Sequence, residues 1–464
     1  MRLVADEPVG HPASPTPVTP PPEPRRPPAL EGMSVQVLDQ SVTRDRVESP
    51  RHYPDNDLVA STLVAAWVPR VGGYGTLAVP HADRPSSGAR PERPVEVGDT
   101  WMTNDVLRVD VAENGHVRVT QLESGRSASP LLSFEDLRDV GDLYTPAPRP
   151  PAADVRFTGL RVIHRGPLRG EMATSWSVER PGAEVAEVAH LSVSLILDAA
   201  APFLRLAADG VSLAFDHRLR IVVNTALRDP EVYADAMFGP VRRVSIVVPP
   251  EDAASELPPP TAPLHRYVSL FSAAGGATIY SDGLGEYEAT PVGGVAITLV
   301  RGVGMLSRND LPERRGHAGW PEETPWAQSP GPFEARFAYM PHGGVRDRGT
   351  VDLIERIADD VLLPLTGATL RSALTVPPPT TGVELEGEGL AFSAAKDSED
   401  GRWMVLRCVN LLDEARAGAW LLGFPVHEAR RARLDEMPGE SLDVTEGHVA
   451  FTAAPREIVT ILVR

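Results

Sequence analysis

The chain has 464 residues, with 45 Lys or Arg against 63 Asp or Glu, so its formal net charge is −18. Such an acidic chain is poorly suited to nucleic acid or to an anionic membrane, because both require clustered positive charge. The single cysteine, Cys408, excludes an intrachain disulfide framework and any multi-cysteine zinc or iron–sulfur site. No apolar run approaches the roughly 18 residues of a membrane span, and the first residues lack the apolar core of a secretory signal. We therefore expect a soluble, cytoplasmic protein.

The first 95 residues are predicted to form two segments. Prolines crowd residues 8–28, where they remove backbone donors and block regular strand pairing. Residues 1–30 are therefore predicted to be a disordered, proline-rich leader, with a polyproline recognition segment as the alternative. Residues 31–95 are predicted to form a small β-domain or the remnant of one.

Residues 96–376 are predicted to form one large antiparallel β-sandwich. Apolar and polar residues alternate on both sides of Asn114-Gly115, and Asn-Gly between alternating runs is the strongest local signal for a hairpin. Further alternating runs follow at spacings of about 8–12 residues, which is typical of an antiparallel sandwich. Residues 249–263, rich in proline and acidic groups, are predicted to be a surface loop. An apolar stripe at helical spacing predicts one short helix near residues 350–362.

The C-terminal part is predicted to be a separate unit. The run PPPTT at residues 377–381 indicates a domain boundary, because both of its flanks are separate series of strands. Residues 377–464 show short alternating runs with turns at Asp400-Gly401 and near Glu414, which predict a small terminal β-sandwich. The fold class that we predict for the whole chain is all-β.

Motifs that would carry an active site are scarce. There is no H-E-x-x-H pair for a metal, no G-x-S-x-G nucleophile elbow and no phosphate-binding glycine motif. Cys408 lies in the strand-like run MVLRCVN, where a cysteine behaves as a small apolar residue rather than as a nucleophile. The residues alone therefore predict an all-β protein without a self-contained active site.

Two polar clusters lie in predicted loops. The first is a glycine-containing turn with the carboxylates of Asp139 and Asp142 and the phenol of Tyr144. The second lies just beyond a predicted strand and contains Arg301, Arg308, Asp310, Arg314 and Arg315. Arg and Tyr at the loop tips of a rigid β scaffold suit carbohydrate hydroxyls, because they supply planar donors, a stacking ring and a hydroxyl. Turn chemistry with surface ion pairs is the alternative interpretation.

Several segments follow one another in a recognisable order: LSFEDLRDVGDLYTPAP, FDHRLRIVVNT, HRYVSLFSAAGGATIYSDGLGEYEA, LVRGVGMLSRNDLPERRGHAG and TPWAQSPGPFEARFAYMPH. Together they resemble the C-terminal half of glycoside hydrolase family 38, the retaining α-mannosidases, in its bacterial mannosylglycerate-hydrolase-like branch. The later segments GLAFSAAKDSEDGRWMVLRCVN and PREIVTILVR agree with this resemblance. It covers residues 33–464 and implies a galactose-mutarotase-like super-sandwich for residues 96–376.

The resemblance implies that the catalytic machinery lies outside this chain. In the family, a preceding catalytic domain carries the zinc ligands and the aspartate nucleophile of a double-displacement reaction, and none of these is matched to a position here. We therefore assign no catalytic residue, and we expect no cofactor in this chain and zinc only in the missing catalytic domain. Tyr144 matches a family tyrosine near the substrate, and Arg301 matches an arginine that points toward the cleft. The weaker substrate-binding candidates are Asp142, Arg308, Asp310 and Arg315.

The expected function is that of the accessory, carbohydrate-binding half of an α-mannosidase, inactive by itself. Its expected partners are an α-mannoside-type carbohydrate and a separately produced catalytic half, and neither nucleic acid nor a membrane. The alternative is a stand-alone carbohydrate-binding or assembly module without a hydrolytic partner. A third candidate, an aldose epimerase on the mutarotase-like fold, rests on fold analogy alone. An adjacent reading frame that encodes a family 38 catalytic domain would distinguish the first two.

Overall fold

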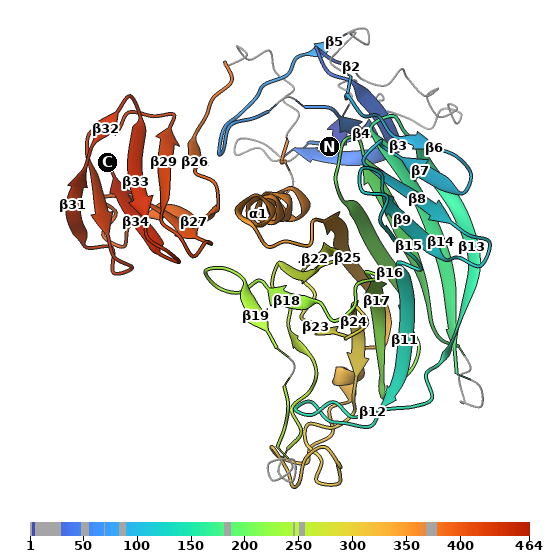
Figure 1. Ribbon diagram of the computed structural model, residues 1–464. Helices are drawn as coiled ribbons and strands as arrows, with labels where there is room; N and C mark the ends of the chain where they lie inside the picture. Colours follow the sequence, from blue (N-terminus) through green and yellow to red (C-terminus); the bar gives the residue numbers. More distant parts are fainter. Residues whose placement is uncertain are drawn as a thin grey trace.

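The computed structural model describes residues 2–4, 29–47, 55–68, 70–82, 90–180, 187–244, 246–249, 256–363, 365–367 and 378–464. This part of the chain is built almost entirely from antiparallel strands, together with one α-helix (Figure 1). The predicted all-β class is therefore confirmed. The expected domain bounds at residues 30, 95 and 376 stay predictions.

Three small sheets form the N-terminal part of the described chain. The first contains β1 (Arg2–Val4), β3 (Val35–Val47) and β4 (Asp55–Ala66), and the second contains β2 (Ala29–Leu30) and β5 (His81–Ala82). The third has the order β10-β9-β8-β7-β6, with β6 (Glu96–Val97), β7 (Trp101–Thr103), β8 (Leu107–Val111), β9 (Val117–Gln121) and β10 (Ser127–Ala128). Strands β1 and β2 differ from the disordered leader expected over residues 1–30, and residues 5–28 lie outside the described residues.

The hairpin predicted at Asn114-Gly115 is confirmed. Strand β8 pairs with β9 in antiparallel fashion, with Val111 opposite Val117. Gly115 has a φ of 82°, a left-handed conformation that glycine adopts without a steric penalty. The side chain of Asn114 accepts a hydrogen bond from the His116 amide at 3.1 Å, which fixes the turn locally.

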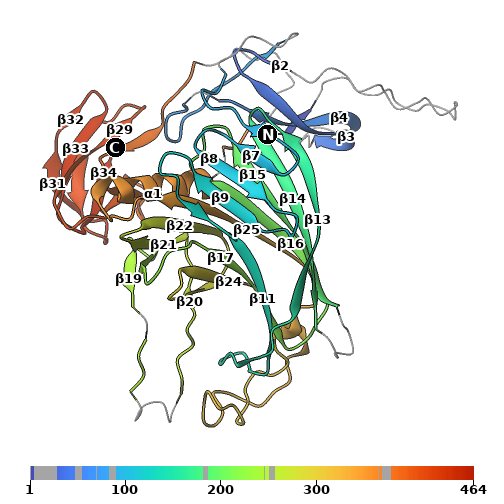
Figure 2. The same cartoon turned by 45° about the vertical axis from the view of Figure 1, so that its right-hand side comes forward.

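A nine-stranded and a six-stranded sheet face each other in the large super-sandwich (Figures 1 and 2). The nine-stranded sheet has the order β13-β14-β15-β16-β25-β22-β21-β18-β19. Its strands are β13 (Asp154–Arg165), β14 (Arg169–Glu179), β15 (Glu187–Asp198), β16 (Leu204–Ser212), β18 (Glu231–Ala234), β19 (Val241–Arg243), β21 (Tyr267–Ser272), β22 (Gly275–Asp282) and β25 (Gly331–His342).

The six-stranded sheet has the order β12-β11-β17-β24-β23-β20 and positions the candidate site. Its strands are β11 (Leu132–Asp139), β12 (Pro148–Arg149), β17 (His217–Asn224), β20 (Ala262–Pro263), β23 (Glu286–Ala289) and β24 (Gly294–Gly302). One apolar cluster fills the space between the two large sheets and includes Leu195, Leu206, Leu219 and Ile297. The turn after β11 and the loop after β24 lie at the same end of the sandwich in both views (Figures 1 and 2).

Helix α1 (Arg348–Leu362) confirms the helix predicted near residues 350–362. The Asp347 side chain caps its first turn by accepting a hydrogen bond from the Thr350 amide at 2.8 Å. The apolar stripe places Ile354 against Tyr280, on the face of the nine-stranded sheet that points away from the six-stranded sheet. No helix in the described part of the chain is both long and apolar enough to cross a bilayer.

Two further sheets form the terminal β-sandwich. The four-stranded sheet contains β26 (Val383–Glu386), β29 (Arg416–Leu422), β32 (Val444–Thr445) and β33 (His448–Ala453). The five-stranded sheet contains β27 (Leu390–Asp397), β28 (Met404–Asn410), β30 (Ala429–Ala432), β31 (Pro438–Leu442) and β34 (Ile458–Val463). Val351 of α1 packs with Val409 and Leu411, so the helix lies between the terminal sandwich and the large one (Figure 1).

Cys408 is a core residue of the terminal sandwich. It lies in β28 with no exposed surface, among the apolar residues that fill this sandwich. Burial raises the pKa of the thiol to about 12. Because the thiolate is the reactive form, the structure agrees with the interpretation of Cys408 as a small apolar residue.

Candidate functional site

The turn that carries Tyr144 is built around a buried carboxylate, Asp139, at the end of β11. One oxygen of Asp139 accepts hydrogen bonds from the amides of Gly141 and Ala147, both at 2.9 Å. A β-carbon on residue 141 would lie 2.2 Å from the carbonyl oxygen of Thr145, so only glycine fits at this close approach. Asp139 thereby closes a fixed turn.

Arg301, near the end of β24, completes this closure. Its Nε donates to the second oxygen of Asp139 at 2.8 Å, and a terminal nitrogen donates to the carbonyl oxygen of Asp142 at 2.7 Å. In the structure the guanidinium of Arg301 thus ties the end of β24 to the turn that carries Tyr144. Contact of Arg301 with a substrate, which the sequence resemblance implies, stays a prediction.

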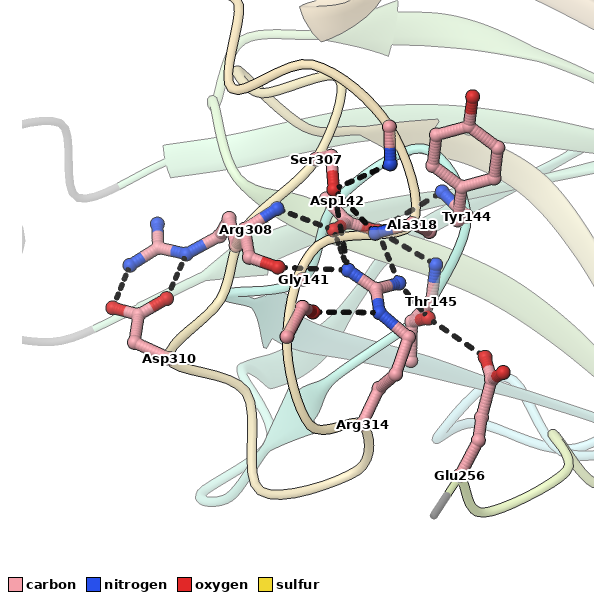
Figure 3. Close-up of polar contacts among 12 residues, drawn as sticks. Gly141, Asp142, Tyr144, Thr145, Glu256, Ser307, Arg308, Asp310, Arg314 and Ala318 are labelled. Carbon is pink, nitrogen blue, oxygen red and sulfur yellow. Dashed lines mark hydrogen bonds and ion pairs between the residues drawn. The ribbon is translucent and has the colours of Figure 1, made fainter.

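Asp142 is fully buried and pairs with Arg314, which belongs to the second polar cluster of the sequence but was not among the predicted substrate-binding residues (Figure 3). Arg314 donates to Asp142 at 2.6 Å, and it also donates to the Thr145 hydroxyl and to the Arg308 carbonyl. The amides of Thr145 and Arg308 donate to the same carboxylate at 2.8 and 2.7 Å, and the Tyr144 amide does so at 3.0 Å. Both carboxylate oxygens are thus engaged, and Asp142 ties the turn after β11 to the loop after β24.

These contacts determine the protonation of the pair. Burial by itself would raise the pKa of Asp142, but hydrogen bonds from Arg314, Arg308 and Thr145 outweigh it and hold the pKa below its usual value. The hydrogen bond between Arg314 and Asp142 also raises the pKa of the Arg314 guanidinium. An acid whose folded-state pKa lies below its unfolded value of about 3.9 stabilises the fold above that pH. This contribution is lost as the pH falls through the folded-state pKa.

Asp142→Asn is expected to lower the stability strongly at neutral pH and progressively less in acid. Protonation of Asp142 in the wild type removes a charge that the variant lacks at every pH, so the difference between the two proteins should begin to shrink below about pH 4 and should vanish only below the folded-state pKa of Asp142. The measurement is the thermal unfolding midpoint of both proteins from about pH 3 to pH 7. A difference between the midpoints that stays constant over this range would contradict the role given to the Asp142 charge.

Tyr144 is the sequence-predicted residue that this turn presents to solvent. Its ring points away from the hydrogen-bonded network (Figure 3), and 54% of its surface is exposed. Its hydroxyl lies beside Gly319, since a β-carbon added there would approach it to 2.9 Å. The next residue, Trp320, is 77% exposed, and Trp326 in the short helix η1 (Pro325–Gln328) is 94% exposed. The turn after β11 and the loop after β24 therefore carry three exposed aromatic residues.

The remaining predicted residues lie on the same loop. Arg308 pairs with Asp310 at 2.7 Å on the surface, and its backbone amide is one of the donors to Asp142. Arg315 is exposed and forms no hydrogen bond or ion pair with the described residues. The sequence analysis overlooked Trp320 and Trp326, although a tryptophan in a polar, proline-containing loop has no core to bury it.

Residues 389–461 match the family model described as the glycosyl hydrolases family 38 C-terminal beta sandwich domain. The matched segment runs from the start of β27 into β34, which is most of the terminal sandwich. These residues are a family 38 C-terminal domain. The resemblance drawn from the sequence is thereby confirmed, and relatives extend it beyond the terminal sandwich.

A putative mannosylglycerate hydrolase from Halalkalibacterium halodurans is 26% identical to this chain in an alignment 397 residues long, which covers 79% of this chain and 42% of the relative. Two crystal structures from Enterococcus faecalis, an α-mannosidase and a family 38 protein, share its fold with TM-scores of 0.75 and 0.74 at 17% and 16% identity. Each similarity covers 95% of this chain, but only 51% and 53% of the solved chains. The chain thus spans about half the length of the relatives that it matches.

The described part of the chain offers no donor set for the zinc ion that the resemblance implies for a complete enzyme. Among its residues, no group of three or more His, Cys, Asp or Glu side chains could hold a metal ion. The sequence contains one His-x-Asp pair, His81 and Asp83, whose side chains lie outside the described residues. We therefore assign no metal-dependent step to this chain.

Proposed function

We propose that this chain is the accessory, carbohydrate-binding half of an α-mannosidase-like glycoside hydrolase and is inactive without a catalytic part. The observation that carries the proposal is the exposed ring of Tyr144 on a turn fixed by two buried carboxylates, Asp139 and Asp142. A side chain that serves packing would be buried, whereas this ring is exposed on a turn whose backbone is fixed by hydrogen bonds. Rigidly mounted loop residues of this kind are typical of binding sites.

The residues around Tyr144 suit a sugar. Aromatic rings pack against the apolar C–H faces of a sugar, and charged side chains form strong hydrogen bonds with its hydroxyls. At this end of the sandwich the rings come from Tyr144, Trp320 and Trp326. The polar groups at its surface come from Arg308, Asp310 and Arg315.

The relatives support a mannoside as the ligand class, since one is named a putative mannosylglycerate hydrolase and another an α-mannosidase. Because the chain spans only about half of each relative, we propose that a catalytic part completes the site. In that arrangement the Tyr144 turn forms one wall of the sugar site.

The full chain is expected to bind methyl α-D-mannoside weakly, with a Kd of about 1 mM. A ligand of about 13 non-hydrogen atoms at ~0.3 kcal/mol per atom gains about 4 kcal/mol. Saturation-transfer difference NMR measures this affinity. Tyr144→Ala should raise the Kd about tenfold, because the contact of one aromatic ring contributes on the order of 1.5 kcal/mol.

The matched control is Tyr74→Ala, which removes an exposed tyrosine from the N-terminal part of the chain. This variant should bind the mannoside as the wild type does. Absence of binding by the wild type would contradict carbohydrate binding by this chain. Equal binding by Tyr144→Ala and the wild type would contradict the assignment of the Tyr144 turn to the sugar.

A further inference from the structure

Arg218 is a buried arginine without a hydrogen-bond or ion-pair partner among the described residues. It lies in β17 with 3% of its surface exposed, and its Nε is buried without a hydrogen-bond partner. Its side chain forms no hydrogen bond or ion pair with the residues that the structure describes. The terminal nitrogens are not among the buried unpaired atoms, so they reach the surface. Burial, followed by the charge of Arg220, lowers the pKa of Arg218.

Two arginines that neighbour Arg218 in the sheet, Arg220 and Arg301, form ion pairs with carboxylates. Arg220, two residues further along β17, forms ion pairs with Glu135 at 2.6 Å and with Glu288. Arg301, directly opposite Arg218 in the β17–β24 ladder, pairs with Asp139. An unpaired buried cation lowers stability, so packing does not explain an arginine at this position. Residues that are kept at a cost in stability are typical of functional sites.

The charges around Arg218 indicate which ligand it would accept. The carboxylates of Glu286, Asp139 and Glu135 act on its charge. Together with Glu288, these carboxylates outnumber the guanidinium groups of residues 218, 220 and 301. An anion would therefore add negative charge to a surface that is already negative. A neutral hydroxyl accepts a hydrogen bond from Arg218 without adding charge, and a neighbouring hydroxyl donates to a carboxylate.

We propose that Arg218 is a substrate-binding residue that donates hydrogen bonds to neighbouring hydroxyls of a neutral sugar, an inference that rests on the proposed function. Its place in the sheet connects it to the Tyr144 turn. Arg301, its partner across the ladder, donates to the carbonyl oxygen of Asp142, two residues before Tyr144. In this arrangement Arg218 contacts the sugar from the sheet, and Tyr144 contacts it from the loop.

The test compares full-length wild type, Arg218→Met and the control Arg138→Met, which removes an exposed arginine from the neighbouring strand β11. Each protein is titrated with methyl α-D-mannoside by saturation-transfer difference NMR. The Nε–Hε signal of Arg218, assigned by its disappearance in the variant, is followed in the wild type. We expect this signal to shift and the Kd of Arg218→Met to rise about tenfold or more, while Arg138→Met binds as the wild type does.

Thermal unfolding separates this role from a structural one. Arg218→Met should keep the unfolding midpoint close to that of the wild type, because the side chain of Arg218 forms no hydrogen bond or ion pair with the described residues. A lower midpoint with unchanged binding would overturn the proposal and show that Arg218 is structural. Wild-type affinity in Arg218→Met, with binding weakened in Tyr144→Ala, would overturn the inference alone and leave the proposed function in place.

Two further outcomes concern the ligand. Absence of mannoside binding by the wild type would overturn both the inference and the proposed function. A shift of the Arg218 signal with inorganic phosphate or D-glycerate, but not with the mannoside, would identify an anion site and overturn the neutral ligand.

Discussion

Arg314→Met is expected to open the turn that carries Tyr144 while leaving both sandwiches folded. The substitution removes the guanidinium that pairs with the fully buried Asp142 and bridges Thr145 to Arg308. Breaking one side of a buried ion pair costs about 3–5 kcal/mol, because the remaining charge stays buried and uncompensated. Amide hydrogen exchange at Thr145 and Arg308 should therefore become at least ~100-fold faster.

The matched control for Arg314→Met is Asp310→Ala, which breaks the exposed pair with Arg308 on the same loop. An exposed pair contributes little to stability, so exchange at the two amides should stay at the wild-type rate. Unchanged exchange in Arg314→Met would mean that the Asp142–Arg314 pair does not hold the turn. Loss of the whole fold in Arg314→Met would mean that the pair supports more than this end of the sandwich.

Tyr144→Ala is expected to lower kcat/KM for an aryl α-mannoside about tenfold or more in a complex with a family 38 catalytic part. Removing the ring forfeits its contact with the sugar, on the order of 1.5 kcal/mol. Assembly should persist, because Tyr144 is exposed and its turn is held by Asp139 and Asp142. Tyr144→Phe keeps the ring, so its kcat/KM measures the contribution of the hydroxyl alone.

Arg301→Met, measured in the same complex, tests whether Arg301 contacts the sugar or positions the turn that carries Tyr144. It should also lower kcat/KM, but through the turn, because Arg301 bonds Asp139 and the carbonyl of Asp142. Hydrogen exchange at the amides of Gly141 and Ala147 should therefore rise in Arg301→Met and stay unchanged in Tyr144→Ala. Lower activity in Arg301→Met with unchanged exchange would instead favour direct contact of Arg301 with the sugar.

Local patterns were sufficient to predict one hairpin and the helix, whereas strands β1 and β2 lie where a disordered leader was predicted. The Asn114-Gly115 turn and the α1 stripe depend on neighbouring residues only, and both were predicted correctly. The terminal sandwich was likewise indicated by the alternation of its strands and then by the family model over residues 389–461. In each case a period of two or of 3.6 residues in the sequence is the physical cause of the element.

The bonding within the site could not be predicted from local patterns. Asp139 and Arg301 are 162 residues apart, and Asp142 and Arg314 are 172 residues apart. Sequence spacing cannot show which of several nearby arginines finds a carboxylate, and here Arg314 rather than Arg315 pairs with Asp142. For the same reason only the structure shows that, among the described residues, Arg220 has two ion-pair partners and Arg218 has none.

The most direct measurement is the hydrolysis of an aryl α-mannoside by the purified chain, with and without zinc. The assay is then repeated after addition of the part of the Halalkalibacterium halodurans relative that the alignment with this chain does not cover. We expect no turnover by the chain alone, and more turnover by the mixture than by the added part alone. Turnover that follows the chain through purification from a host lacking α-mannosidase would contradict the accessory role. A mixture no more active than the added part would contradict it as well and would favour a stand-alone binding module.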